Sequence, residues 1–418
     1  MATIRTQRRS SVWAFLLPVV PLCAAGVATI HATGTDPQNG WLSPEALRQL
    51  EFIGIGLAAM VLVMLVSYHR LGRAAWPLFV VGVALLALLI ADRWVNLGFV
   101  PVRRGTRRWL LIAGQQVQPS EMMKIVYVLA IAWYLRYRRN YRTLRGLLAP
   151  FAITLVPMSL ILLQPDLGTV LLFGPVLMTM LFAAGARLKH LLIILLLGAL
   201  CAPVFFLNLR DYQRLRITGV LLQSETIRER FLRNPDLWDA LRSAGTDKGQ
   251  WRRELTDWEM HAGYQLVHSK AAIGSGGVLG QGFGDGPFVQ HNLLPERHND
   301  FIFAMIAHQW GLVGALVVIL CYLCLVLIGF EVATFTDDPF GRLVAVGLTA
   351  MLVVQSVTNL CMTVGLGPIT GITLPFVSAG GSSMVASFVM VGLLMSVARH
   401  RPVLIANKPF QFDDEQEG

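Results

Sequence analysis

The chain has 418 residues and a formal net charge of +10; 55% of the residues are hydrophobic and only 14% are charged. A typical soluble domain has about 25% charged residues, so this composition excludes an ordinary soluble fold and favours residence in a bilayer. The basic residues fall in short segments between apolar runs, where they set membrane topology. We therefore expect membrane lipids, and no nucleic acid, among the partners.

The apolar runs predict an all-α integral membrane protein, a single polytopic domain over residues 1–418 with about ten transmembrane helices. Each run is long enough to cross about 30 Å of hydrocarbon. The first run resembles a secretory signal peptide, but its prolines, its length and its lack of a small-residue cleavage site favour a retained helix. The predicted spans are 12–30, 52–68, 75–91, 120–135, 147–163, 167–185, 191–208, 311–330, 343–363 and 382–398.

Alternation of these spans places the arginine-rich connections on one side, which the positive-inside rule assigns to the cytoplasm. Both termini are then cytoplasmic, and the acidic tail 402–418 is expected to be disordered. The outer side holds a large loop, 209–310, with twelve basic and twelve acidic residues. Its charged first half, 224–260, predicts surface helices. A segment near 367–381 is expected to be re-entrant, because its small residues and prolines lie between two spans.

Four polar stretches are all predicted to lie at the outer side, and this convergence indicates a functional site. The first contains Arg107, Arg108 and Trp109, followed by a helix that starts near Pro119. Glu121 and Lys124 are three residues apart and share one helix face. A lysine within the membrane needs a partner or a polar cavity, although the pair could serve only to pack helices.

The second stretch, 164–169, is a tight turn between two apolar runs. Asp166 could cap the helix that follows, or it could meet Lys124, because both lie at the outer ends of neighbouring spans.

The third stretch joins a glycine-rich run, 271–286, to the polar sequence 294–303. The glycines are no dinucleotide fingerprint, because no strand precedes them; taken alone, they favour a flexible loop over a phosphate-binding one. Asn299 or Asp300 could be the N-cap of a helix over 301–310. The fourth stretch, 367–383, ends in a serine pair, Ser382 and Ser383, which could cap the last helix.

In this order the stretches resemble the RodA/FtsW (SEDS) family of peptidoglycan glycan-strand polymerases. The matching motifs are Q-P-S-E-x-x-K, Q-P-D-L-G-T, A-I-G-S-G-G-x-x-G-x-G, L-P-E-R-H-x-D-F-I-F and G-I-x-L-P-F-V-S-x-G-G-S-S, and they cover most of the chain from Trp109 to Arg401. Arg297, His298 and the run Ile372–Ser378 look more like the elongation-type member RodA than the division-type FtsW.

The resemblance implies a glycosyltransferase in the bacterial cytoplasmic membrane, with its active site facing outward. Such enzymes polymerise lipid II, the undecaprenyl-diphosphate-linked disaccharide pentapeptide, and work with a class B penicillin-binding protein. The family's catalytic aspartate falls on Asp300, which would act as general base. The residues expected to bind substrate or line the cavity are Arg108, Trp109, Glu121, Lys124, Asp166, Glu296, Arg297, His298, Ser378 and Ser382.

The diphosphate that leaves in this inverting reaction needs positive charge, which Arg107, Arg108, Arg297, Lys124 or a divalent cation, Mg²⁺ or Mn²⁺, could supply. We expect no organic cofactor.

The sequence departs from the family pattern in three places. Ala379 stands where a tyrosine is usual, and His308 and Gln309 stand where an acidic pair is usual. The outer loop is longer than usual around 224–258, which suggests an altered partner surface.

Two other functions fit the same features. A flippase for the lipid-linked precursor would also use about ten helices and a broken segment, but it needs a site near the midplane, whereas these motifs gather at the outer face. A non-catalytic scaffold would have no need of Asp300.

Overall fold

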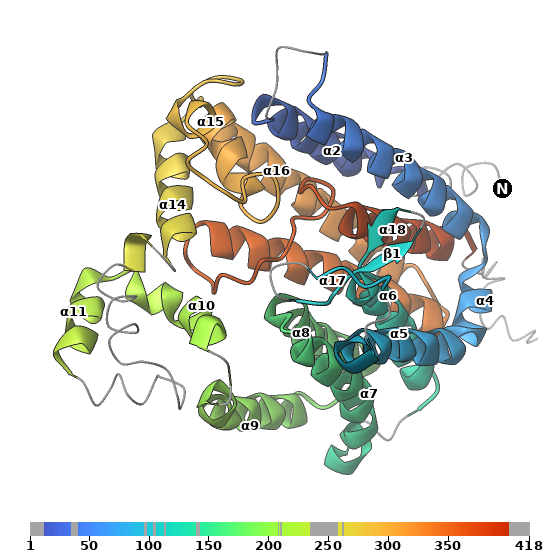
Figure 1. The fold of residues 1–418 in the computed structure, drawn as a ribbon. Helices are drawn as coiled ribbons and strands as arrows, with labels where there is room; N and C mark the ends of the chain where they lie inside the picture. Colours follow the sequence, from blue (N-terminus) through green and yellow to red (C-terminus); the bar gives the residue numbers. More distant parts are fainter. Residues whose placement is uncertain are drawn as a thin grey trace, which may run out of the picture.

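The computed structural model describes residues 12–34, 41–95, 98–102, 106–112, 114–138, 143–207, 209, 211–234, 258–260 and 263–400. Nearly all of its regular elements are helices (Figure 1). Before the large loop these are α2 (Leu16–Ala32), α3 (Pro44–Leu65), α4 (Tyr68–Arg73), α5 (Ala75–Val95), α6 (Pro119–Leu135), α7 (Leu144–Leu163), α8 (Leu167–Ala184) and α9 (Leu188–Leu207). A two-stranded antiparallel sheet, β1 (Leu110–Ile112) and β2 (Gln115–Val117), precedes α6.

The large loop and the C-terminal part are also helical. They contain α10 (Asp211–Leu222), α11 (Glu225–Arg233), the 3₁₀ turn η2 (Trp258–Met260), α14 (Tyr264–Gly276), α15 (Pro287–Gln290), α16 (Ile302–Thr334), α17 (Pro339–Thr363) and α18 (Gly381–His400). The expected surface helix of the loop is α11, while most of the long insertion around 224–258 and the tail 402–418 lie outside the described residues.

A helix overlaps each of the ten predicted spans. In the described part of the chain, seven helices are long and apolar enough to cross a membrane: α3, α5, α7, α8, α16, α17 and α18. Shorter apolar stretches form α2 and most of α9, and α6 has 17 residues. The all-α membrane fold is thus confirmed, and the number ten stays a prediction.

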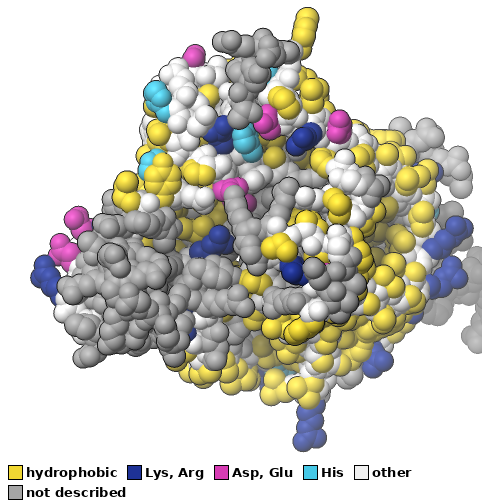
Figure 2. All heavy atoms as spheres, viewed as in Figure 1, with side chains coloured by type: hydrophobic (Ala, Val, Ile, Leu, Met, Phe, Trp, Pro, Cys, Tyr) yellow, Lys and Arg dark blue, Asp and Glu magenta, His cyan; other side chains and the backbone are white. Residues whose placement is uncertain are grey.

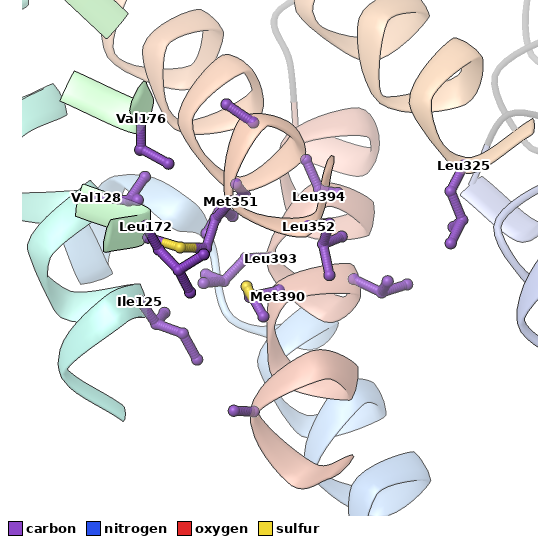
Figure 3. Packing of buried hydrophobic residues seen from close by; sticks show 14 of the residues in the cluster. Ile125, Val128, Leu172, Val176, Leu325, Met351, Leu352, Met390, Leu393 and Leu394 are labelled. Carbon is purple, nitrogen blue, oxygen red and sulfur yellow. The ribbon is translucent and has the colours of Figure 1, made fainter. Parts of the chain in front are cut away.

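The centre of the bundle is built around α17 and α18. In their most apolar stretches, 61% of the residues of α17 and 78% of those of α18 are buried, against 22% for α3. Figure 3 shows the packing where α6, α8, α17 and α18 meet, with Val128, Leu172, Met351, Met390 and Leu393 in one cluster. In a bilayer such side chains stabilise the bundle through van der Waals packing, because lipid tails are as apolar as the side chains themselves.

The peripheral helices expose their apolar side chains. On the face drawn in Figure 2, hydrophobic side chains cover the lower right, over α5 and α7. Large side chains such as Val80 on α5 and Leu148 on α7 are 63% and 69% exposed. A soluble protein rarely leaves so much apolar surface uncovered, so this surface is suited to contact with lipid.

The glycine-rich run docks onto a break in α16. Gly311 has φ +63°, which interrupts the helix. The backbone of the run bonds on both sides of this break: Gln281 N–H donates to the His308 carbonyl at 2.9 Å, and Leu312 N–H donates to the Gly277 carbonyl at 2.9 Å. The expectation of a merely flexible loop is therefore wrong, because these backbone groups are paired.

An irregular segment, 364–380, joins α17 to α18. Its side chains at Ile372, Leu374, Phe376 and Ser378 are buried. Non-helical backbone in a membrane protein has to be buried in protein or line a cavity, and here it is buried, as the sequence predicts. Its entry into the membrane stays a prediction.

Candidate functional site

The segment 364–383, which contains the fourth polar stretch, is hydrogen-bonded to the third and the first. Ser378 Oγ donates to the Asn299 carbonyl at 2.7 Å, in the turn that carries Asp300. Ser382 Oγ accepts from Gln118 N–H at 3.0 Å, at the start of α6. The predicted convergence of the stretches is thus present as hydrogen bonds between residues far apart in sequence.

Asp300 lies in a half-buried turn just before α16. Phe301, not Asn299 or Asp300, is the N-cap of this helix, and no side chain caps it; the capping hypothesis for this pair is therefore wrong. The Asp300 carbonyl accepts from Asn359 Nδ2 at 2.8 Å. A Cβ added to Gly371 would lie 3.3 Å from Asp300 Oδ2. The carboxylate thus faces the irregular segment, close to the positive end of the α16 dipole.

The turn before Asp300 is fixed by contacts on three sides. Glu296 Oε2 accepts from Asn299 Nδ2 at 2.8 Å. Ala379 N–H donates to the His298 carbonyl at 2.8 Å. Arg297 Nε donates to the Thr33 carbonyl, at the end of α2, at 3.1 Å. Arg297, His298 and Glu296 therefore hold the backbone that positions Asp300.

Hydrogen bonding defines His298 as a neutral ring. Thr33 Oγ1 donates to the Thr29 carbonyl at 2.7 Å, so it accepts from His298 Nδ1–H at 3.2 Å. His298 Nε2 accepts from Arg297 Nε at 3.3 Å. Burial, and secondly the Arg297 charge, lower the pKa of His298 to about 4. Burial also lowers the pKa of Arg297, an effect that Glu45 opposes.

This low pKa predicts acid sensitivity. The contribution of His298 to the free energy of unfolding is constant above pH 6.5. It is lost as the pH falls toward 4, because the unfolded state then binds a proton that the folded state does not. At pH 5.5 the loss is on the order of 1 kcal/mol. When the pH is lowered from 7.5 to 5.5, the melting temperature of His298→Gln should therefore fall less than that of the parent. Equal drops would contradict the assignment, and the exposed His291, changed to Gln, is the control.

Glu121 and Lys124 form a buried ion pair on α6. Lys124 Nζ lies 2.8 Å from Glu121 Oε2, and the lysine side chain is 1% exposed. Lys124 also donates to Gln355 Oε1 on α17 at 2.8 Å. Gln355 Nε2 in turn donates to the Thr373 carbonyl at 3.0 Å. The pair thus ties α6, through α17, to the irregular segment.

Asp166 serves as the N-cap of α8, as one of the two hypotheses predicted. Its carboxylate accepts from Thr169 N–H at 3.2 Å and from Thr169 Oγ1 at 3.0 Å, and from Gln118 Nε2 at 3.2 Å. The expected contact between Asp166 and Lys124 is wrong: the lysine is engaged by Glu121 and Gln355, and Asp166 faces Arg108 at 3.9 Å.

The arginines of the first stretch bind protein groups. Arg107 pairs with the fully buried Asp92 on α5. Arg108 Nε donates to the Gln164 carbonyl at 2.6 Å, at the C-terminal end of α7. The two guanidinium groups therefore attach the segment before β1 to α5 and to the end of α7. Trp109 is half-buried beside them.

The serine pair does not cap α18. Ser382 Oγ donates to the Gln116 carbonyl in β2 and accepts from Gln118 N–H at the start of α6, both at 3.0 Å. Ser383 Oγ bonds Thr373 Oγ1 at 2.6 Å.

Two residues that depart from the family pattern make hydrogen bonds to the glycine-rich run. His308 bonds Ser275 Oγ at 2.7 Å, and Gln309 accepts from Gly284 N–H at 3.3 Å.

Gly371 offers a test of the packing around Asp300. Its φ is +72°, where an alanine costs roughly 1–2 kcal/mol, and the new methyl would touch the carboxylate. We expect Gly371→Ala to lower activity at least tenfold, by displacing Asp300. Gly98 has a similar φ, +75°, and a Cβ added there would meet no atom within 4 Å. Gly98→Ala therefore reproduces the backbone strain without the contact to a carboxylate. Equal activities of the two variants, measured by product formation, would contradict this packing.

Sequence reasoning missed three residues at the site. Asn359 and Gln355 project from α17, and Arg216 Nη1 lies 3.7 Å from the added Cβ of Gly371. A polar residue every four positions in α17 was a usable signal for the first two. The polar sequence 211–216 at the start of the large loop was the signal for Arg216. Among the described residues, no group of three or more His, Cys, Asp and Glu side chains could hold a metal ion.

The fold and the polar site define a multi-pass membrane protein with a half-buried carboxylate, Asp300, next to the irregular segment. The family model for FtsW, RodA and SpoVE, described as a cell cycle protein, matches residues 11–229 and 249–402. The chain belongs to this family.

Similar curated proteins carry both RodA-type and FtsW-type names. The peptidoglycan glycosyltransferase RodA of Treponema pallidum is 30% identical over 91% of this chain and 96% of its own length. The probable peptidoglycan glycosyltransferase FtsW of Geobacter metallireducens is 32% identical, over 84% of each chain. The peptidoglycan glycosyltransferase MrdB of Escherichia coli is 31% identical over 84% of this chain and 86% of its own.

Solved structures share the fold. One solved structure is described as showing the structural coordination of polymerization and crosslinking by a peptidoglycan synthase complex. One of its chains matches this chain with a TM-score of 0.69 and 29% identity, over 93% of this chain and 98% of that one. The rod shape determining protein RodA of Thermus thermophilus has a TM-score of 0.62 and 27% identity, covering 94% of this chain and 97% of that one.

Proposed function

We propose that this chain polymerises lipid II into glycan strands at the outer face of the bacterial cytoplasmic membrane, with Asp300 as general base. The chain is a glycosyltransferase of peptidoglycan synthesis, in line with the names of its relatives. The observation that supports the role of Asp300 most is its placement. The residue is not the N-cap of α16, yet its turn is held by Ser378, His298 and Asn359.

Asp300 would accept the proton of the acceptor 4-hydroxyl as that oxygen attacks the anomeric carbon of the donor. The new glycosidic bond forms while the bond to the diphosphate breaks, and the diphosphate leaves with the electron pair. The configuration inverts, so no covalent enzyme intermediate is needed. The N-terminus of α16 favours the ionised form of a nearby carboxylate.

A divalent cation, Mg²⁺ or Mn²⁺, would neutralise part of the diphosphate charge. We expect it to bind mainly through the substrate's own phosphates, as Mg²⁺ does in many phosphate sites. We further propose a class B penicillin-binding protein as partner, in line with the synthase complex that this fold resembles. Both termini would be cytoplasmic.

We propose an elongation role, on the resemblance of Arg297, His298 and Ile372–Ser378 to RodA. The relatives named FtsW are similar to a comparable degree, so a division role is the second candidate. Depletion of the chain separates the two: loss of rod shape supports elongation, and filaments without septa would overturn it.

The experiment for the activity uses purified protein in liposomes with fluorescent lipid II and Mg²⁺ or Mn²⁺. Glycan ladders on a gel report polymerisation, and chemical quenching of the outer leaflet reports translocation. We expect ladders without translocation, with or without an added penicillin-binding protein. Translocation without ladders would overturn the proposal in favour of a flippase, and neither signal would favour a scaffold.

A further inference from the structure

All four basic residues expected to neutralise the leaving diphosphate are engaged elsewhere in the structure. The contacts that engage them are Arg107 with Asp92, Arg108 with the Gln164 carbonyl, Lys124 with Glu121 and Gln355, and Arg297 with the Thr33 carbonyl. Arg107 and Lys124 are neutralised by carboxylates. The N–H groups of Arg108 and Arg297 that donate to carbonyls are not free to donate to a phosphate. The site proposed above therefore needs another source of positive charge.

Arg216 on α10 is a cation that faces Asp300. A Cβ added to Gly371 would lie 3.3 Å from Asp300 Oδ2 and 3.7 Å from Arg216 Nη1. The two side chains thus approach the same small space, and their separation cannot exceed the sum of these distances. This is short enough for one sugar–diphosphate linkage to contact both.

Arg216 is exposed, and no hydrogen bond or ion pair within the described part of the chain engages its guanidinium. Arg214, two residues earlier, differs: it is buried, and its Nε donates to the Leu209 carbonyl at 3.0 Å. The two arginines of α10 therefore have different roles, since one holds the end of α9 and the other is open to a ligand.

Two contacts tie α10 to the irregular segment, one through its backbone and one through the side chain of Gln223, the residue that follows it. Ile369 N–H donates to the Arg216 carbonyl at 3.3 Å. Gln223 Nε2 donates to the Gly365 carbonyl at 2.8 Å, and its Oε1 accepts from Lys270 Nζ at 3.0 Å. In Figure 1, α10 lies next to the ends of α14 and α17. The position of Arg216 is thus set by the same segment that contacts Asp300.

We propose that Arg216 binds the diphosphate of the undecaprenyl carrier and stabilises it as it leaves. This inference rests on the proposed polymerase function. The planar guanidinium can donate two parallel hydrogen bonds to phosphate oxygens, on the side of the anomeric carbon away from the attacking hydroxyl. Asp300 receives the hydroxyl proton, the diphosphate receives the electrons of the broken bond, and Arg216 stays protonated throughout.

The test measures binding and turnover separately in detergent-solubilised protein. Undecaprenyl diphosphate, the released carrier, is the binding probe, and lipid II ladders report turnover. We expect Arg216→Gln to weaken binding of the probe at least tenfold and to lower kcat by about 10²–10³. Arg216→Lys should recover part of the binding and part of the turnover, because lysine retains the positive charge but cannot donate two parallel hydrogen bonds.

Two further variants separate the possible failures. Asp300→Asn should bind the probe at least as well as the parent, because it removes a negative charge while blocking turnover. Arg233→Gln, on the exposed face of α11, should match the parent in both assays. Parent-like binding and turnover by Arg216→Gln would overturn the inference and leave the polymerase intact. A parent that makes no ladders under any condition would instead overturn the proposed function.

Discussion

Asp300→Asn is expected to lower the rate of glycan synthesis by about 10³, within the range that a general base contributes. Asparagine matches the shape of the aspartate but cannot accept the proton of the acceptor hydroxyl. The backbone contact of residue 300 with Asn359 is unaffected by this substitution. Single-turnover formation of the first glycosidic bond measures the effect without interference from product release.

The thermal unfolding of this variant should match that of the parent, which separates loss of chemistry from loss of folding. Asp285→Asn, a matched change in the exposed part of the glycine-rich loop, should leave the rate unchanged. A folded Asp300→Asn variant with at least a tenth of the parent rate would remove Asp300 as the base.

Lys124→Met is expected to have the largest effect on stability, a loss of about 3–5 kcal/mol. The substitution leaves the Glu121 carboxylate buried without its cation, and it removes the donor to Gln355. The helix–helix contact between α6 and α17 then contains an uncompensated charge. Thermal unfolding in detergent, followed by tryptophan fluorescence, measures the loss.

A double substitution identifies the cause. Glu121→Gln combined with Lys124→Met removes both charges, so it should be less destabilising than Lys124→Met alone. Lys189→Met, at an exposed position on α9, should change stability little. A double variant at least as unstable as Lys124→Met would show that the ion pair itself is not what stabilises this contact.

Local features of the site could be predicted from the sequence. The ion pair of Glu121 and Lys124 follows from a spacing of three residues on a helix, and the cap by Asp166 follows from an aspartate before an apolar run. The helices of the bundle follow from hydrophobic runs of sufficient length. These signals act over a few residues, so a single sequence contains them in full.

The contacts that join distant segments could not be predicted. Nothing in the sequence pairs Gln355 with Lys124 or places Arg216 beside Gly371. The spacing of polar residues on one helix indicates a polar face, but it does not show which residue of another element that face meets. The expected contact between Asp166 and Lys124 was wrong for this reason. Two residues at neighbouring helix ends were assumed to meet, whereas Gln355 reaches the lysine from a third helix.

Whether this chain forms glycosidic bonds at Asp300 can be read from a single gel. The purified parent and Asp300→Asn are given the same fluorescent lipid II, the same divalent cation and the same penicillin-binding partner. We expect long ladders from the parent and none above background from the variant, with equal amounts of folded protein. Ladders of equal length and intensity in both lanes would contradict this expectation.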